Sequence, residues 1–136
     1  MLTPTAIALL ALIGWTLALL VLMEILRAGL VLTGKVPANG FAPDNAGLSP
    51  FMQRLARAHA NCIEGLPIFG GLLLAALATG RSSVTDPLAF VLLLARITQS
   101  SVHLASLSPT AVTARFCFFA VQLAIAAWWV VGLALS

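Results

Sequence analysis

The stretch RLARAHANCIEGLPIF, which begins at residue 54, places two arginines, an asparagine and a glutamate at the spacing of one helix face. With about 100° per residue, these four side chains fall within an arc of about 80°. They are Arg54, Arg57, Asn61 and Glu64. His59 points away from this stripe and is predicted to be a packing or interfacial residue. Because arginine can bind a carboxylate through two parallel hydrogen bonds, the stripe is suited to an anionic ligand.

A second polar stripe is predicted between Arg96 and His103, with Gln99 on the same side of the helix. Arg115 follows near the start of the last apolar segment. Charged side chains inside a membrane turn inward and pair, so by default they indicate a functional site. The arginines of these segments outnumber their glutamates, and a buried arginine without a carboxylate attracts an anion. The sequence therefore predicts an anion-binding pocket that several helices share.

The segments that position these residues are very apolar. The chain has 136 residues, of which 61% are hydrophobic and 8% are charged, whereas charged residues make up about 25% of an average globular domain. Crossing a bilayer takes about 20 residues of helix, and backbone polar groups cannot stay unpaired in hydrocarbon. The sequence predicts one all-α membrane domain over residues 1–136, an antiparallel bundle of four transmembrane helices. The predicted spans are about 5–32, 51–78, 87–107 and 111–135.

Turn-rich segments separate the four spans. Thr85 and Asp86 stand directly before Pro87, which is typical of a helix start and places the third helix there. The basic residues near the first and third loops are Lys35, Arg54, Arg57 and Arg115, whereas the other side of the membrane has Arg81. The positive-inside rule therefore predicts cytoplasmic first and third loops, with both termini on the opposite side. Trp128 and Trp129 are predicted to anchor the C-terminal end at the interface.

Several classes of site are disfavoured by composition. The net charge of +3 comes from few, dispersed charges, which does not suit a nucleic-acid surface. Cys62 and Cys117 lack the spacing of a metal site or of a disulfide framework, so no metal is predicted. Glu24 and Arg27 are three residues apart and can form either a structural ion pair or part of a functional site.

The pattern R-x-x-R-A-H-x-N-x-x-E followed by LPIF resembles the second-helix signature of the MAPEG family, the membrane-associated proteins in eicosanoid and glutathione metabolism. The chain length, the four spans, the long first loop and the short third loop agree with that family over essentially the whole chain. The resemblance implies a homotrimer that binds glutathione between neighbouring subunits near the cytosolic face. The compact Ala/Leu-rich sequence is typical of a bacterial member, which implies the bacterial inner membrane and termini in the periplasm.

The resemblance also implies roles for individual residues. The implied glutathione-binding residues of the second helix are Arg54, Arg57, Asn61 and Glu64. Arg96 matches a third-helix arginine of several members, and His103 stands where eukaryotic enzymes often have a ligand-contacting tyrosine. Arg115 matches the fourth-helix arginine that is implied to stabilise the glutathione thiolate, which makes it the expected catalytic residue. Ala60 replaces an arginine of many eukaryotic members, and the chain contains no tyrosine.

The function that the resemblance implies is detoxification by a membrane-bound glutathione transferase. We expect thiolate attack on a lipophilic electrophile, or reduction of a lipid peroxide. Two alternatives remain open at this point. A small four-span transporter could use Glu24 as its intramembrane carboxylate, and a non-catalytic MAPEG-fold membrane protein would be consistent with Ala60 and the missing tyrosine.

Overall fold

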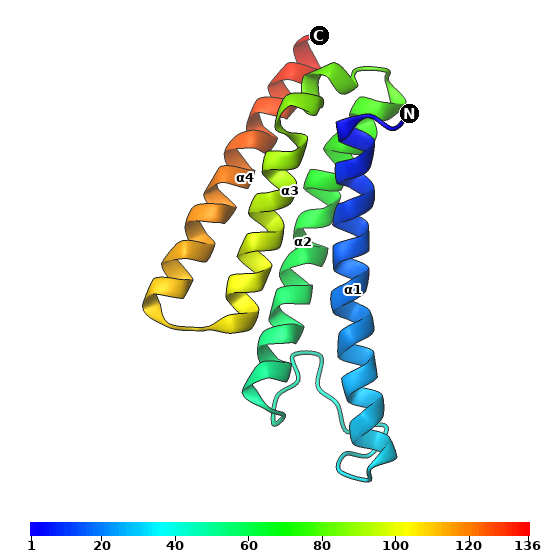
Figure 1. Cartoon of the computed structure of the whole chain (residues 1–136), viewed down its shortest axis with the longest axis vertical. Helices are drawn as coiled ribbons and strands as arrows, with labels where there is room; N and C mark the ends of the chain where they lie inside the picture. Colours follow the sequence, from blue (N-terminus) through cyan, green and yellow to red (C-terminus); the bar gives the residue numbers. More distant parts are fainter.

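The computed structural model describes residues 1–136 and consists of four α-helices with no strands, which confirms the predicted fold class (Figure 1). The helices are α1 (Pro4–Leu32), α2 (Pro50–Ala78), α3 (Ser82–Ala105) and α4 (Pro109–Leu135). Three of them start with the same local sequence, a serine or threonine N-cap followed by proline. The cap oxygen accepts from a free N–H of the first turn, and proline is favoured there because it lacks an N–H.

The third helix begins at Ser82, so the predicted start at Pro87 was wrong. A tight turn from Arg81 to Val84 starts the helix earlier, with a hydrogen bond of 3.0 Å between the Val84 N–H and the Arg81 carbonyl. Asp86 does not cap this helix. Its Oδ1 accepts from the backbone N–H of Thr5 at 2.9 Å, so it caps the first turn of α1 instead. Pro87 lies in the second turn of α3, where it removes the hydrogen bond that an N–H at this position would donate to the Ser83 carbonyl.

The helices run up and down, and the long loop between α1 and α2 lies at the same end as the short loop between α3 and α4 (Figure 1). Helix α1 packs against α2 and α3, whereas α4 packs mainly against α3, touches α2 less and does not contact α1. The bundle is therefore open along the side where α2, α3 and α4 meet.

Two groups of apolar side chains form the interior. The larger cluster includes Phe69, Leu92 and Trp129, and the smaller one joins Leu19 of α1 to Leu55 of α2. Trp129 is fully buried in the larger cluster, so only Trp128, which is exposed, fits the predicted interfacial anchor. The two tryptophans are about 100° apart around α4, so Trp128 lies at the surface when Trp129 packs into the core.

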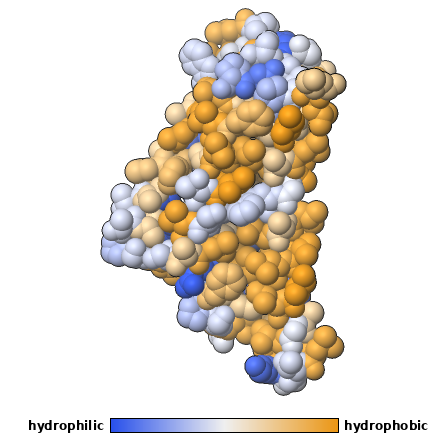
Figure 2. Space-filling view, viewed as in Figure 1, coloured by the Kyte–Doolittle hydropathy of each residue, from blue (hydrophilic) through white to orange (hydrophobic).

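The outer surface is apolar along the length of the helices. All four helices are long and apolar enough to cross a membrane, and the chain is an integral membrane protein. Hydrophobic residues cover most of the face in Figure 2, while hydrophilic residues gather toward its ends. The exposed large side chains include Leu10, Leu17, Ile25, Leu94, Phe116 and Val130. Lipid tails are the solvent that such a surface requires.

Candidate functional site

The polar stripe of α2 faces α3 and α4 and forms one wall of a cleft of about 400 Å³. Three helices contribute to this polar cleft, which is lined by Arg57, Ala60, Asn61, Glu64, His103 and Arg115. The structure thus brings together five residues that the sequence proposed for a site, although they lie up to 58 positions apart (115 − 57). The periodicity of α2 and the short loop before α4 place these side chains at the end of the bundle where the first and third loops lie.

His103 and Asn61 are held together across the α2–α3 interface. The Asn61 Nδ2 lies 3.3 Å from His103 Nδ1. Because an amide nitrogen can only donate, His103 accepts through Nδ1, and its neutral ring then has the proton on Nε2. That Nε2 is buried and has no partner within the chain. The Nε2–H of His103 is therefore a hydrogen-bond donor without a partner in a residue that lines the polar cleft.

The charges of the polar cleft are not paired with one another. The chain contains a single ion pair, between Glu24 and Arg27, which lies elsewhere. Arg57 and Arg115 line the cleft together with Glu64, yet no carboxylate oxygen is within 4.0 Å of either guanidinium. The buried Nε of Arg115 also has no hydrogen-bond partner. The cleft thus has two available cations and one available carboxylate.

A second cleft of about 290 Å³ adjoins the first and shares Asn61 and Glu64 with it. Most of its remaining wall is apolar, so we call it the apolar cleft. It is completed by Gly65, Ile68, Phe69, Arg96, Gln99, Phe119 and Leu123. Its position at the middle of α2 and α4 makes it deeper in the membrane than the polar cleft.

Arg96 is 3% exposed, and its guanidinium is held without a carboxylate. Nη1 donates to the backbone carbonyl of Asn61 at 3.3 Å. The guanidinium carbon lies 5.3 Å from the ring centre of Phe69 and 6.0 Å from that of Phe119. Aromatic faces attract cations, which offsets part of the cost of burying the charge. Nη2 has no partner and is the unused donor of this residue.

Gly65 makes room for that guanidinium. A Cβ atom at residue 65 would lie 2.6 Å from Arg96 Nη2 and 2.9 Å from the nearest ring carbon of Phe69. Such distances are far shorter than a van der Waals contact, so glycine is required for Arg96 to adopt its position. The sequence around Gly65 does not identify this partner, because Arg96 is on another helix.

Arg54 is the one predicted site residue that lies outside both clefts. Its Nε donates to the backbone carbonyl of Leu104 at 2.8 Å. The last carbonyls of a helix lack partners within the helix, so Arg54 satisfies one of them at the end of α3. His59 lies on the α2 face that packs against α1, between Leu55 and Cys62 of the smaller core cluster.

Gln122 is a polar residue that the sequence reasoning missed. It is fully buried in α4, and its Nε2 donates to Gln99 Oε1 at 2.8 Å and to the Phe118 carbonyl at 3.0 Å. A glutamine in the middle of an apolar span is itself a signal, because polar groups in a membrane helix turn toward other helices. The position of its partner on α3 could not be inferred without the packing.

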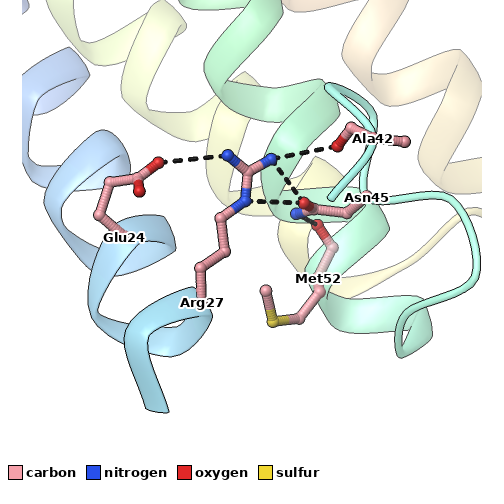
Figure 3. A network of polar contacts seen from close by, with 5 residues as sticks. All are labelled: Glu24, Arg27, Ala42, Asn45 and Met52. Atoms are coloured by element: carbon pink, nitrogen blue, oxygen red, sulfur yellow. Dashed lines mark hydrogen bonds and ion pairs between the residues drawn. The ribbon is translucent and has the colours of Figure 1, made fainter. Parts of the chain in front are cut away.

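Glu24 and Arg27 form part of a network that ties the long loop to α1 (Figure 3). Arg27 Nη1 lies 3.3 Å from Glu24 Oε1, and Arg27 Nη2 donates to Asn45 Oδ1 at 2.6 Å. Asn45 is buried, and its Nδ2 donates to the Met52 carbonyl at 2.7 Å. Glu24 has a side chain 56% exposed at the rim of this network. Glu24 therefore helps to anchor the loop, and its carboxylate does not lie in the centre of the bundle.

The comparisons with known proteins agree with the resemblance drawn from the second-helix pattern. The model of the MAPEG family matches residues 5–135. A search of curated proteins and a search of solved structures each found no match. The family match covers nearly the whole chain, including all the residues that line the polar and apolar clefts. The chain therefore belongs to the MAPEG family.

Proposed function

We propose that the protein is a membrane-bound glutathione transferase that acts on lipophilic electrophiles, with peroxidase activity toward lipid peroxides. The family includes glutathione transferases and related proteins, which supports this proposal. The observation on which it rests is the polar cleft, where Arg57, Glu64 and Arg115 come together without pairing. Two free cations and one free carboxylate complement glutathione, an anionic tripeptide with two carboxylates, one ammonium and a thiol.

Three groups of glutathione have a charged partner in this cleft: one carboxylate, the ammonium and the thiol. Arg57 binds a carboxylate through the fork of its guanidinium, and Glu64 receives the ammonium. Asn61 and His103 supply further hydrogen bonds from α2 and α3. A free thiol has a pKa of about 8.5, so it is mainly protonated at neutral pH. Arg115 is the catalytic residue in this proposal, because its charge beside the sulfur favours the thiolate.

The reaction joins a water-soluble nucleophile to a substrate from the lipid. The thiolate sulfur forms a bond to an electrophilic carbon, and the electron pair leaves with a halide or moves onto a conjugated acceptor. Holding both reactants in one place replaces a slow encounter by an intramolecular step. The polar cleft lies at one end of the bundle and the apolar cleft deeper, so the two reactants can arrive from different sides.

The proposal includes the assembly and the orientation of the protein. We propose a homotrimer in which a neighbouring subunit covers the open side of the bundle along α2 and α4. The first and third loops face the cytoplasm, where glutathione is available, and both termini lie in the periplasm of a bacterial cell. The biological role is then removal of reactive lipophilic compounds from the inner membrane.

Turnover of a chromogenic aryl halide with glutathione tests the proposed function. We expect the purified protein in detergent micelles to bind glutathione and to form the coloured conjugate. Arg115→Ala should keep measurable glutathione binding but lose the ultraviolet absorbance of the bound thiolate, with turnover at least about a hundredfold lower. Lys35→Ala is the matched control, since Lys35 is an exposed cation at the same end and lines neither cleft.

The same experiment can reject the proposal. If the wild-type protein neither binds glutathione nor forms conjugate, the transferase assignment is wrong. If it binds glutathione and forms no conjugate, the chain is a non-catalytic member of its family. Equal turnover by the wild type and Arg115→Ala would remove Arg115 from the catalytic role.

A further inference from the structure

Gln99 and Gln122 form an amide pair whose orientation can be determined from its contacts. Gln122 Nε2 donates to the backbone carbonyl of Phe118 at 3.0 Å. A carbonyl can only accept, so the amino group of Gln122 must point this way. The same Nε2 lies 2.8 Å from Gln99, and Gln99 must therefore present its oxygen to it. The amide nitrogen of Gln99 is left as a donor that makes no hydrogen bond within the chain.

This free nitrogen belongs to a residue of the apolar cleft. Gln99 lines the cleft, whereas Gln122 lies behind it and is fully buried. Arg96 lines the same cleft from one helical turn away on α3, and its buried Nη2 has no partner. Two unused N–H donors thus occur on one side of a cleft whose other walls are Ile68, Phe119 and Leu123.

The buried Nη2 of Arg96 indicates a missing acceptor, and the free amide nitrogen of Gln99 belongs to the same cleft. More than nine in ten buried polar groups have a hydrogen-bond partner, and an unsatisfied one costs about 1–3 kcal/mol. Lipid tails cannot supply that partner, because they contain no acceptor. Ile68 is 51% exposed and Leu123 is 45% exposed on the single chain, so the apolar cleft opens on the side along α2 and α4. A lipophilic molecule would enter it where the neighbouring subunit of the proposed trimer meets the lipid.

We propose that Arg96 Nη2 and Gln99 Nε2 bind an oxygen atom of the lipophilic substrate, and that Gln122 is a positioning residue that orients the Gln99 amide. The inference rests on the proposed function and specifies its second substrate. That substrate is an apolar chain with an oxygen that becomes negatively charged when the thiolate attacks. A conjugated enal and a lipid hydroperoxide share this chemistry.

In both reactions the charge develops where the two donors lie. With an enal, the sulfur bonds to the β-carbon, the double-bond electron pair moves onto the carbonyl oxygen, and the enolate takes a proton from water. With a hydroperoxide, the sulfur bonds to the terminal oxygen, the O–O bond breaks, and the alkoxide takes a proton from water. The glutathione sulfenic acid then reacts with a second glutathione to give the disulfide and water. Donors aimed at a developing oxyanion stabilise the transition state more than the ground state.

Comparison of three substrates tests this assignment. Benzyl chloride is the reference, because its departing charge is on chloride and it has no oxygen. The other two are a long-chain conjugated enal and a lipid hydroperoxide. We expect Gln99→Leu to lower the ratio of kcat/KM for the oxygen-containing substrates to that for benzyl chloride by about a hundredfold. Gln122→Leu should lower it by about tenfold, although Gln122 lies outside the cleft.

Each outcome decides the matter. A fall for the enal alone, or for the hydroperoxide alone, supports the oxygen site and identifies its substrate. A ratio that stays constant for both overturns the oxygen site. Wild-type protein that turns over none of the three substrates contradicts the proposed function instead.

A binding measurement on the wild-type protein tests the oxygen site even if the Gln99 and Gln122 variants do not fold. A long-chain methyl ketone should raise the Tm of the detergent-solubilised protein more than the alkane of the same chain length does. This binding requires no chemistry, so it can be observed even if the transferase proposal is wrong. Equal shifts from the ketone and the alkane would show that the cleft has no oxygen site.

Discussion

At the scale of single residues, the chain keeps an arginine buried in the membrane without a carboxylate. An uncompensated charge in a low-dielectric interior is costly, and several weak partners share the compensation at Arg96. The backbone carbonyl of Asn61 accepts a hydrogen bond from its guanidinium. The ring centres of Phe69 and Phe119 lie 5.3 Å and 6.0 Å from the guanidinium carbon, close enough for a cation–π interaction. The absence of a side chain at Gly65 completes the site, because it leaves the volume that Nη2 occupies.

Substitution of Gly65 by alanine should therefore displace the Arg96 guanidinium. The added methyl group would meet Nη2 at 2.6 Å, and overpacking of this kind typically costs about 1–3 kcal/mol. We expect a lower Tm in detergent and weaker turnover of the enal. Gly71→Ala is the matched control in the same helix, because nothing lies within 4 Å of a Cβ at residue 71. It should be neutral or stabilising by up to about 1 kcal/mol. Equal behaviour of the two variants would contradict the packing argument.

At the scale of the elements, specific side-chain hydrogen bonds fix the long loop between α1 and α2. Asn45 adopts a positive φ of 57°, a conformation that asparagine tolerates better than most residues. Its side chain joins Arg27 of α1 to the carbonyl of Met52 at the start of α2. The loop therefore links the first turns of α2, where the polar stripe begins, to the end of α1.

Removal of the Asn45 side chain should release this loop. Asn45→Ala removes one acceptor of the Arg27 guanidinium and the donor to the Met52 carbonyl, at a cost of about 1–3 kcal/mol. It also places a less tolerant residue at positive φ. We expect faster amide hydrogen exchange across residues 36–48, measured by mass spectrometry. Asn39→Ala is the control, because Asn39 is exposed and its side chain makes no hydrogen bond. Unchanged exchange in Asn45→Ala would show that the network does not restrain the loop.

At the scale of the whole molecule, polarity is unequal between the two ends of the bundle. The end with the first and third loops has Lys35, Arg54, Arg57 and Arg115, and it contains the polar cleft. The opposite end has Arg81, whose guanidinium bonds to the Leu133 carbonyl, and Asp86, which caps α1. The same asymmetry supports the proposed orientation, and in that orientation the polar cleft would face cytosolic glutathione.

The orientation can be measured with single cysteines. In a Cys117→Ser background, in which the remaining Cys62 is buried, Asn39→Cys reports on the first loop and Ser83→Cys on the opposite end. A membrane-impermeant maleimide added to intact spheroplasts should label Ser83→Cys at once. It should label Asn39→Cys only after the membrane is permeabilised. The reverse pattern would invert the proposed topology.

Much of this structure could be predicted without coordinates. Apolar segments of sufficient length determine the four helices, because no other structure satisfies the backbone in hydrocarbon. The period of 3.6 residues places Arg57, Asn61 and Glu64 on one face, and the resemblance to the MAPEG family identified the family correctly. These features depend on local order along the chain, which a sequence contains directly.

Other features required the packing of the helices. Periodicity defines a face of one helix, but it does not define what that face meets or how far a side chain reaches. Arg54 belongs to the same stripe as Arg57, yet it caps α3 outside the clefts. Trp129 is buried next to an exposed Trp128 for the same reason. Arg96 of α3 packs against Gly65 of α2 so closely that a Cβ added at residue 65 would lie 2.6 Å from Nη2. Contacts of this kind depend on the rotation and separation of whole helices, which are set by all the side chains between them.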